Sequence, residues 1–467
     1  MPSLTVGPIL GAQTLTNAHY SQRIFVRGTT NLGLQTAWVR LRETGGEFSY
    51  VQSAELKENQ DFTHVFEFQN LPPDSVFEIS SCSVAGCSVD EPSWDALTHK
   101  FKTPALNVQV TAFTFGSCRS PDRGKDRLGD DRCFKVIADR HLDDDFVLMC
   151  GDQIYADFSL KGRPLIKHDE RMTLEHFLSH YRKFFARPSF AEVVGSLPTY
   201  MIMDDHEVLN NWSQGAFERG EEGFENLQIR DDGLKAYALY QASLADAGGH
   251  DPASFHFEFS HGRCDFFMMD QRSQRDVERN TQNQNEYNLI LDNQMCDLKS
   301  FISNGHDRIK FIVSPVPMLP DSRNSIFARV FDTHPEERWE GYPSQRGEIL
   351  SAIHHEQVSG TNKNFVILSG DVHCSSLYQL RHQDDPAFNL YQVTSSAFNW
   401  TVFPGLNDIN FARKKPLKGN PDYVPKRLGG RVLNQHNFCR IHVSDTLHVT
   451  FYDNRGKLLR EKHLELR

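Results

Sequence analysis

The first 105 residues alternate apolar and polar positions in short runs. Four of these runs are RIFVRG (23–28), QTAWVRLR (35–42), THVFEFQNL (63–71) and VFEISSCSV (76–84), and turn-forming Gly, Asn, Asp and Pro lie between them. A period of two is typical of strands that bury one face and expose the other. The pattern therefore predicts an N-terminal β-sandwich domain over residues 1–105.

From residue 106 to residue 467 the strands become apolar along their whole length. They are TAFTFGSC, DDFVLMCGD, PTYMIMDDHE, CDFFMMDQR, IKFIVSPVPM and NFVILSGDVH. Continuous apolar runs are typical of strands that are covered on both faces. Helical periodicity over 132–142, 174–185 and 286–303 predicts helices between them. Strands that alternate with helices predict a layered α/β domain over 106–467.

The last residues, 438–466, return to an alternating pattern. The turn signals SDT and NRG divide them into three runs, FCRIHV, LHVTFYD and KLLREKHLEL. We therefore predict an antiparallel meander of three strands at the end of the chain.

The charge balance narrows the classes of partner. Fifty basic against 61 acidic residues give a net charge of −11, which argues against bulk binding to nucleic acid or to anionic membranes. The N-terminus has no basic region followed by a long apolar core, and no segment approaches the roughly 20 apolar residues of a membrane span. We expect a cytoplasmic protein without a transmembrane segment, and its oligomeric state is left open.

Four of the apolar runs end in residues of metal-binding type. These residues are Cys118, then Asp152 and Tyr155, then Asp204, Asp205, His206 and Glu207, and finally Asp371 and His373. In layered α/β domains the chemistry gathers at the carboxyl ends of the strands. Packing gives no reason for four such groups at four strand ends, so the pattern predicts a metal centre there.

The same motifs carry a family resemblance. GSCRS, GDQIYAD, DDHEVLNNW and SGDVHCSS, in this order, resemble the motifs of PhoD-like alkaline phosphatases and phosphodiesterases of the calcineurin-like metallophosphatase superfamily. GPILGAQTLTNAHYSQRIFVR, WEGYPSQR and TSSAFNW extend the resemblance over nearly the whole chain. It implies a four-layer αββα sandwich, and LPPDSVFEI resembles a corner of immunoglobulin-like and fibronectin type III modules in the preceding β-sandwich.

The resemblance also implies which residues hold metal ions. Asp152 would bridge two ions, with Cys118, Tyr155 and His373 completing the first site and Asp205 and Asp371 the second. The family implies Fe³⁺ in the first site and Ca²⁺ in the second, with Mn²⁺ or Zn²⁺ as substitutes. Ligand softness agrees, because thiolate, phenolate and imidazole suit a transition metal and carboxylates suit a hard cation.

Other residues are expected to support this site or to depart from the superfamily pattern. Asp204 and Glu207 would lie behind the ligands, with Glu207 orienting His206, and Asp270 and Arg272 would form a supporting pair. Where the superfamily usually supplies a further histidine to the second ion, the strand FIVSPVPM has Ser314.

The expected mechanism follows from the two ions. Cations about 3.5–4 Å apart would hold phosphate oxygens and lower the pKa of a bridging water to about 7, so that a metal-bridging hydroxide attacks phosphorus in line. His206 would act beside the leaving oxygen as hydrogen-bond donor or general acid. Arg119, next to Cys118, is a candidate fork for a phosphate oxygen.

The sequence thus predicts a metal-dependent phosphoric ester hydrolase of the alkaline phosphatase D type. Its substrate would be a small-molecule or lipid phosphate ester, with phosphodiesters favoured slightly over monoesters. One alternative is a phospholipase D-like or phosphotriester hydrolase that uses the same site. The other is a non-catalytic adhesion or scaffold protein with a degenerate metallophosphatase domain, which the retention of all four ligand groups argues against.

Overall fold

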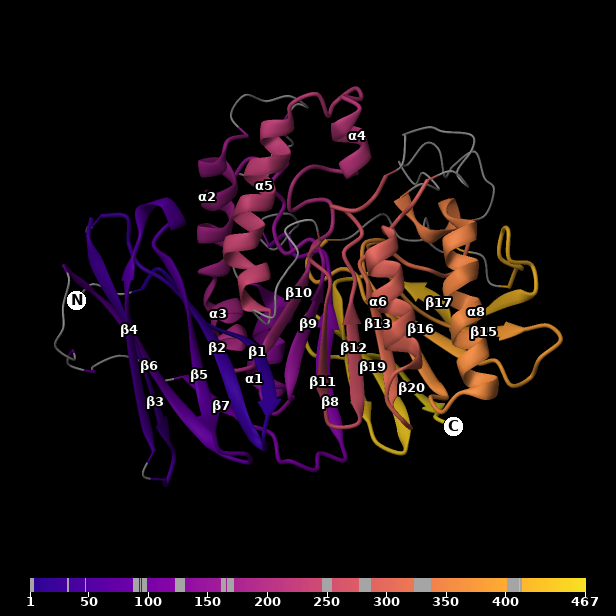
Figure 1. Cartoon of the computed structure of the whole chain (residues 1–467), viewed down its shortest axis with the longest axis horizontal. Coiled ribbons are helices and arrows are strands. Elements are labelled where there is room, and N and C mark those ends of the chain that lie inside the picture. The colour runs from indigo at the N-terminus through magenta and orange to yellow at the C-terminus, as the bar shows by residue number, and fades with distance from the viewer. Residues whose placement is uncertain are drawn as a thin grey trace.

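Figure 1 shows the chain as a computed structural model. The structure describes residues 4–467 apart from 32, 47, 87–91, 93, 95–98, 122–130, 161–164, 166–171, 246–253, 277–286, 323–336, 401–410 and 412–413. No helix of the described residues is long and apolar enough to cross a membrane.

Two antiparallel sheets form the N-terminal region. One has the order β1 (Val6–Thr16), β2 (His19–Arg27), β5 (Thr63–Leu71), and the other the order β4 (Ser49–Leu56), β3 (Gln35–Glu43), β6 (Val76–Ala85), β7 (His99–Lys102). The short helix η1 (Glu58–Gln60) leads into β5. Leu10, Ile24 and Phe66 of the first sheet belong to one apolar cluster with Val39, Leu41 and Phe77 of the second. The alternating pattern thus produced the predicted strands, with their apolar faces turned toward each other.

The first of these sheets also packs against the rest of the chain. Phe25 on β2 is fully buried in a cluster with residues of the α/β region. Asp61 accepts hydrogen bonds from Arg27, from Arg182 on α2 (Leu174–Phe185) and from Tyr240 on α5 (Leu227–Tyr240). The N-terminal region is therefore held by apolar and ionic contacts as well as by its covalent connection.

A six-stranded sheet has the order β10 (Thr199–Ile202), β9 (Phe146–Cys150), β8 (Thr111–Gly116), β18 (Asn437–Val443), β19 (Thr446–Asp453), β20 (Leu458–Glu465). Its first three strands are parallel. The last three form the predicted meander, which pairs with β8 in antiparallel register.

A seven-stranded sheet has the order β11 (Phe257–His261), β12 (Cys264–Met268), β13 (Ile309–Ser314), β14 (Asn364–Ser369), β16 (Leu390–Thr394), β15 (Ser375–His382), β17 (Tyr423–Leu433). Strands β12, β13, β14 and β16 are parallel. Phe113 of the six-stranded sheet contacts Phe266 and Phe311 of this sheet edge to face, at ring-centroid distances of 5.4 and 5.6 Å. The two sheets therefore share one apolar core.

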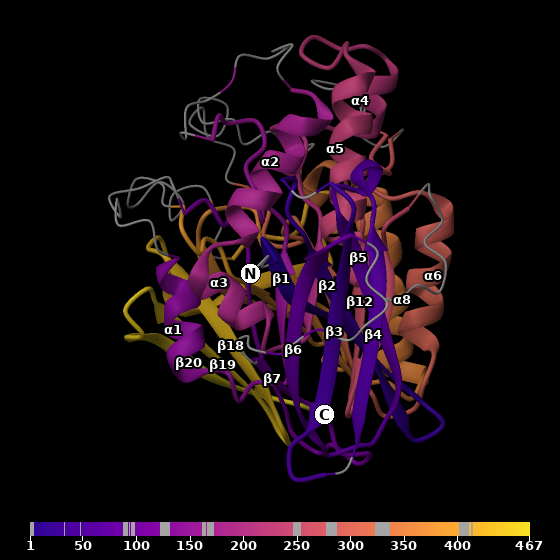
Figure 2. The same cartoon turned by 90° about the vertical axis from the view of Figure 1, so that its left-hand side faces the viewer.

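Helices cover the outer faces of the two sheets. Figure 2 shows α1 (Arg132–Arg140), α2 and α3 (Pro188–Val194) on one side of the strands, and α6 (Asp292–Ser303) and α8 (Pro343–Ser359) on the other. The shorter elements are α4 (Gln214–Glu218), η2 (Ala242–Leu244) and η5 (Trp339–Gly341). The chain is thus mixed α/β with several sheets.

One helix begins later than its periodicity predicted. The prediction was 286–303, but α6 begins at Asp292, and residue 286 lies outside the described residues. The backbone N–H groups of Leu289 and Ile290 donate to the Gln345 side chain, and that of Leu291 donates to Gln274. Side-chain amides therefore take the hydrogen bonds of this segment, which ends extended at Leu291 (ψ 168°).

Candidate metal centre at the carboxyl edge of the strands

Asp152 lies at the centre of the first group of predicted ligands. Its Oδ2 is 3.4 Å from the Cys118 Sγ, and it accepts a hydrogen bond from the Tyr155 hydroxyl at 3.3 Å. The three residues follow β8 and β9, which are adjacent parallel strands, so both strands deliver their ends to the same edge. A thiol, a phenol and a carboxylate thus share one buried point.

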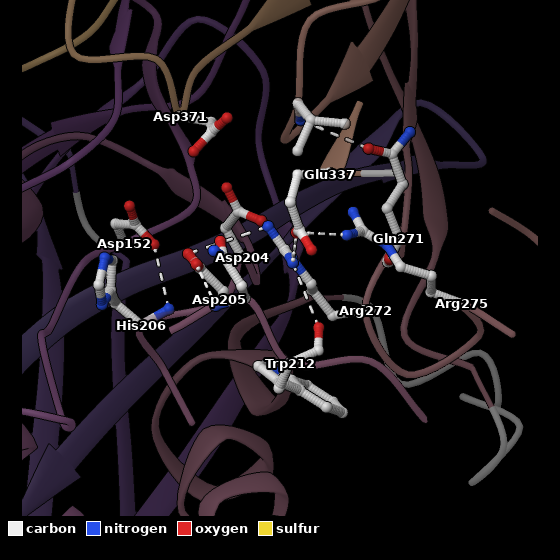
Figure 3. Close-up of polar contacts among 12 residues, drawn as sticks. Asp152, Asp204, Asp205, His206, Trp212, Gln271, Arg272, Arg275, Glu337 and Asp371 are labelled. Carbon is white, nitrogen blue, oxygen red and sulfur yellow. Dashed lines mark hydrogen bonds and ion pairs between the residues drawn. The ribbon is translucent and has the colours of Figure 1, made fainter. Parts of the chain in front are cut away.

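Carboxylates gather beside this point. Ligand atoms of Asp152, Asp205 and His206 lie within 4.8 Å of one another, as do those of Asp204, Asp205 and Asp371. Asp205 belongs to both groups and so joins them (Figure 3). The structure therefore brings the four predicted aspartates together.

The remaining predicted ligand, His373, joins the site through Ser396. The Ser396 hydroxyl contacts the Cys118 Sγ at 3.1 Å and accepts the His373 backbone N–H at 3.0 Å. The His373 ring stacks on Trp400 at 5.0 Å, and Trp400 stacks on Tyr155 at 4.7 Å. An aromatic stack thus connects Tyr155 of the GDQIYAD motif with His373 of the SGDVHCSS motif through Trp400.

Four of the predicted ligands have a left-handed backbone. The φ angles are 56° at Cys118, 59° at Asp152, 64° at Asp371 and 50° at His373. Residues other than glycine rarely adopt this conformation, and where they do at a strand end the strain is a mark of functional sites. Each strand therefore ends in a sharp turn that presents a side chain to the common edge.

Two glycines allow these turns to lie close together. Gly151 has a φ of 93°, and a Cβ there would stand 2.4 Å from the Asp204 Cβ. A Cβ at Gly370 would stand 2.5 Å from the Ser117 Cβ. The Gly-Asp pairs that end the two apolar runs are thus a packing requirement as well as a placement of the acid.

Burial makes the full set of anions unfavourable. It raises the pKa of Asp152 well above the usual range, with Asp205 as the next cause, and it raises the pKa of Asp371 to about 6 together with Asp205. For Asp205, burial alone would raise the pKa, but His206 and Arg272 outweigh it and lower the pKa. Asp205 is therefore readily ionised, whereas Asp152 and Asp371 resist ionisation.

The residues fit bound cations. Asp204 Oδ2 and Asp205 Oδ1 are buried and accept no hydrogen bond among the described residues. Burial, followed by Asp152 for Cys118 and by Cys118 for Tyr155, raises the pKa of the Cys118 thiol and of the Tyr155 hydroxyl. A cation would stabilise the carboxylate, thiolate and phenolate forms, which are the forms that bind metals.

His206 is held by a residue that the sequence analysis missed. Its Nδ1 contacts both oxygens of Asp157, at 2.8 and 2.9 Å. Burial alone would lower the pKa of His206, but Asp157, then Asp205 and Asp152, raise it well above its usual range. Asp157 follows Asp152 by five positions in the same turn, and that proximity was the available signal.

Glu207 does not orient His206, contrary to the prediction. Its carboxylate accepts the backbone N–H groups of Asp152 at 3.1 Å, Gln153 at 2.6 Å and Asp204 at 3.0 Å. Glu207 therefore fixes the two turns relative to each other, and Asp157 has the role that was assigned to it.

Arg272 supports the site through its guanidinium, which contacts Asp204 and Glu337. Arg272 Nε donates to Asp204 Oδ1 at 2.6 Å and Nη1 donates to Glu337 at 2.8 Å (Figure 3). Glu337 also accepts from Arg275 at 2.6 Å. Asp270 Oδ1 accepts the backbone N–H groups of Arg272 and Ser273, so the two residues predicted as a supporting pair are joined through a turn.

Arg119 is not brought to the phosphate side of the centre. Its guanidinium donates to Asp131 at 2.5 Å and to the Phe184 carbonyl at 2.7 Å, and both ionic side chains are fully buried. The guanidinium carbon lies 3.8 Å from the centroid of the Phe190 ring on helix α3. This placement does not support the predicted contact with a phosphate oxygen.

Ser314 belongs to an internal hydrogen-bond group. Its hydroxyl donates to the Val316 carbonyl at 2.6 Å and accepts from Trp339 Nε1 at 3.1 Å and from Gln271 at 2.9 Å. The residue at the position of the superfamily histidine is thus engaged in packing.

Known proteins are similar to this chain in sequence and in fold. A family profile described as PhoD-like phosphatase matches residues 113–409. Alkaline phosphatase D of Bacillus subtilis (strain 168) is 22% identical over 348 residues, which are 70% of this chain and 56% of that protein. The chain thus spans little more than half the length of that relative. A solved structure of PhoD superposes with a TM-score of 0.72 at 17% identity, over 99% of this chain and 93% of that one, and shows the same fold.

Proposed function

The chain belongs to the PhoD-like phosphatase family, and on that premise we propose that it is a metal-dependent phosphoesterase. The observation that carries the proposal is the convergence on Asp152. A buried thiol and a buried phenol lie 3.4 and 3.3 Å from one carboxylate oxygen, beside further buried carboxylates. Buried polar groups normally find partners, and cations would provide them for this set.

Two groups of residues would hold the ions. Cys118, Tyr155 and His373 would bind Fe³⁺, because thiolate, phenolate and imidazole favour a transition metal. Asp205 and Asp371 would bind Ca²⁺, because carboxylate oxygens favour a hard cation. Asp152 would be shared, and Mn²⁺ or Zn²⁺ are the substitutes to test. When bound, the ions would neutralise the phosphate charge and acidify a water molecule.

The chain's own residues have defined parts in the reaction. Asp157 holds His206 at Nδ1 and favours its protonated form, so that His206 would donate a hydrogen bond or a proton to the leaving oxygen. Arg272 pairs with Asp204 and thereby fixes the turn that carries Asp205. Glu207 would keep the turns of Asp152 and Asp204 at a constant separation.

The arrangement also bears on substrate, domain organisation and location. We propose a small-molecule or lipid phosphate ester as substrate, with diesters favoured slightly. The clusters support a four-layer αββα domain over 106–467 with an immunoglobulin-like sandwich over 1–105 as its accessory. A cytoplasmic location stays a prediction, which cell fractionation would test.

The experiment combines metal analysis with substrate assays. We expect bound iron and calcium, and a tyrosinate-to-iron absorption band that disappears in Tyr155→Phe but persists in Tyr378→Phe, a control at another buried tyrosine. The protein should hydrolyse bis(p-nitrophenyl) phosphate and p-nitrophenyl phosphate.

The alternatives give different outcomes. Preferential hydrolysis of a p-nitrophenyl phosphotriester or of phosphatidylcholine would favour a phosphotriester hydrolase or a phospholipase D-like hydrolase that uses the same site. A protein that stays metal-free and inactive after reconstitution with iron, calcium, manganese or zinc would overturn the hydrolase proposal in favour of a scaffold.

A further inference from the structure

Three histidines form a row across the meander. His448 on β19 is the cross-strand partner of His442 on β18 and of His463 on β20. Leu447 and Val449, the neighbours of His448, point into the core between the two sheets. Since side chains alternate along a strand and paired residues share a face, the three imidazoles lie on the opposite face of the sheet.

A carboxylate completes the row at its outer end. Glu461 Oε1 is 2.6 Å from His448 Nε2 and 4.0 Å from His463 Nε2. The two imidazole rings are stacked at 4.1 Å with an interplanar angle of 7°. His448, Glu461 and His463 each offer one ligand atom, and these three atoms lie within 4.8 Å of one another. Two ring nitrogens therefore converge on one carboxylate oxygen.

These contacts have the chemistry of a transition-metal site. Zinc binds imidazole nitrogen and carboxylate oxygen at about 2.0–2.2 Å, which places tetrahedral ligands about 3.3 Å apart. The observed separations of 2.6 and 4.0 Å lie on either side of that value, and the two stacked rings would tilt so that both Nε2 atoms face one ion. We propose that His448, His463 and Glu461 bind one divalent transition-metal ion of the zinc type.

The site is separate from the centre at the strand ends. His442 pairs with Ala112, which precedes Cys118 by six residues on β8. At about 3.3 Å per residue, Ala112 lies about 13 Å from Gly116, the last residue of β8, and β19 and β20 lie further across the sheet. It also lies outside residues 113–409, the range of the family profile. The inference therefore does not depend on the proposed phosphoesterase activity.

Solvent exposure makes the site accessible. The side chains of His448, Glu461 and His463 are 28%, 46% and 65% exposed. β20 is the edge strand of its sheet, and an ion held by residues of β19 and β20 would tie that edge to its neighbour. Metal binding would thus stabilise the end of the meander.

The test is a titration of the metal-loaded protein with ZnCl₂ by calorimetry. Wild type should bind one equivalent of Zn²⁺ more than His448→Gln/His463→Gln. His463→Gln alone should weaken this binding by about tenfold or more, because loss of even an outer partner of a metal-bound histidine costs about 10- to 100-fold. Zinc should raise the Tm of wild type but not of the double variant.

His306→Gln is the matched control, because His306 is an exposed histidine outside the meander. This variant should bind Zn²⁺ as wild type does. If the double variant does not fold, Glu461→Gln keeps the shape of the side chain and replaces it in the comparison. Equal zinc stoichiometry and affinity in wild type and variants would overturn the proposal. Basal hydrolysis should be unchanged, because the three residues are remote from the strand ends.

Discussion

The buried centre and the exposed histidine row use similar residue types in opposite surroundings. At the centre, ligands come from separate strand ends, and left-handed turns at Cys118, Asp152 and Asp371 aim them at one point. In the row, antiparallel register alone sets His448 opposite His463. Paired strands position their side chains through strand register alone. Turns that converge from separate strands need other residues to hold them in place.

The supports at the centre are visible in its hydrogen bonds. Glu207 accepts three backbone N–H groups from two turns, and Arg272 holds Asp204. In the row, His448 contacts Glu461 and stacks on His463, both residues of the neighbouring strand β20. The activity of the centre should therefore be sensitive to residues that never touch substrate, whereas metal binding in the row should respond only to loss of its own ligands.

Asp152→Asn should have the largest effect on activity. The substitution keeps the size of the side chain but removes the charge on which Cys118 and Tyr155 converge. Loss of several kcal/mol of transition-state stabilisation corresponds to about a 10³-fold fall in kcat/KM. Steady-state hydrolysis of bis(p-nitrophenyl) phosphate measures this effect. Asp139→Asn, at an exposed aspartate of α1, is the control, and an equal loss there would contradict the assignment.

Metal removal should expose the electrostatic cost of burial. Burial, with Asp205 as the next cause, raises the pKa of Asp371 to about 6 from 3.8, so the folded chelated protein binds this proton more tightly than the unfolded chain does. Its stabilising contribution is complete, at about 3 kcal/mol, only below about pH 3.8 and is lost as pH rises through about 6; about 1.4 kcal/mol of it remains at pH 5 and almost none at pH 8.

The measurement is the free energy of unfolding of chelated protein at pH 5 and pH 8. Wild type should be less stable at pH 8, and Asp371→Asn should lose less stability over this range because it has no charge to bury. A fall of equal size in both proteins would show that Asp371 is not responsible.

The orienting role of Asp157 gives a third prediction. Asp157→Asn should lower kcat by about 10²-fold, the lower end of the contribution of a positioned acid. Because Asp157 raises the pKa of His206, the variant should also lose activity at lower pH on the alkaline side of its profile. The loss should be greater for an alkyl leaving group than for p-nitrophenolate, which leaves without a proton. Equal losses for both leaving groups would exclude the acid role.

The smallest effect is expected in the row. Without added zinc, His463→Gln should change the free energy of unfolding by less than about 0.5 kcal/mol, as is usual for exposed side chains. Urea denaturation with and without ZnCl₂ would show a difference between variant and wild type only when zinc is present. A large loss without zinc would mean that the row is a packing feature and not a ligand site.

Most residues of the centre could be predicted from the sequence, because each ligand ends or follows an apolar run and the carboxyl ends of such strands carry the chemistry in layered α/β domains. Cys118, Asp152, Asp205 and Asp371 all have this property. Asp157 could have been suspected only from its closeness to Asp152 in sequence, and nothing in the local pattern identified its partner His206 or the partners of Glu337, Arg272 and Arg275. Arg119 had a favourable position in the sequence, but the buried Asp131 directs its guanidinium toward the helices.

The N-terminal region shows the same limit. Its alternating pattern predicted the strands, but not that Phe25 of one sheet would be buried against the α/β region. The consecutive apolar residues Ile24, Phe25 and Val26, all fully buried, were the local sign of a strand covered on both faces. Which element covers the second face could not be read from them.

The strands, most helices and the residue types at the strand ends could be predicted from the sequence, because hydrophobic periodicity and chain order are local properties. The tertiary structure decided which side chains meet. It joined Asp157 to His206, Glu207 to two turns and His448 to Glu461, since these contacts depend on strand order and register. The type of each residue is given by the sequence, but its contacts depend on how distant segments of the chain pack together.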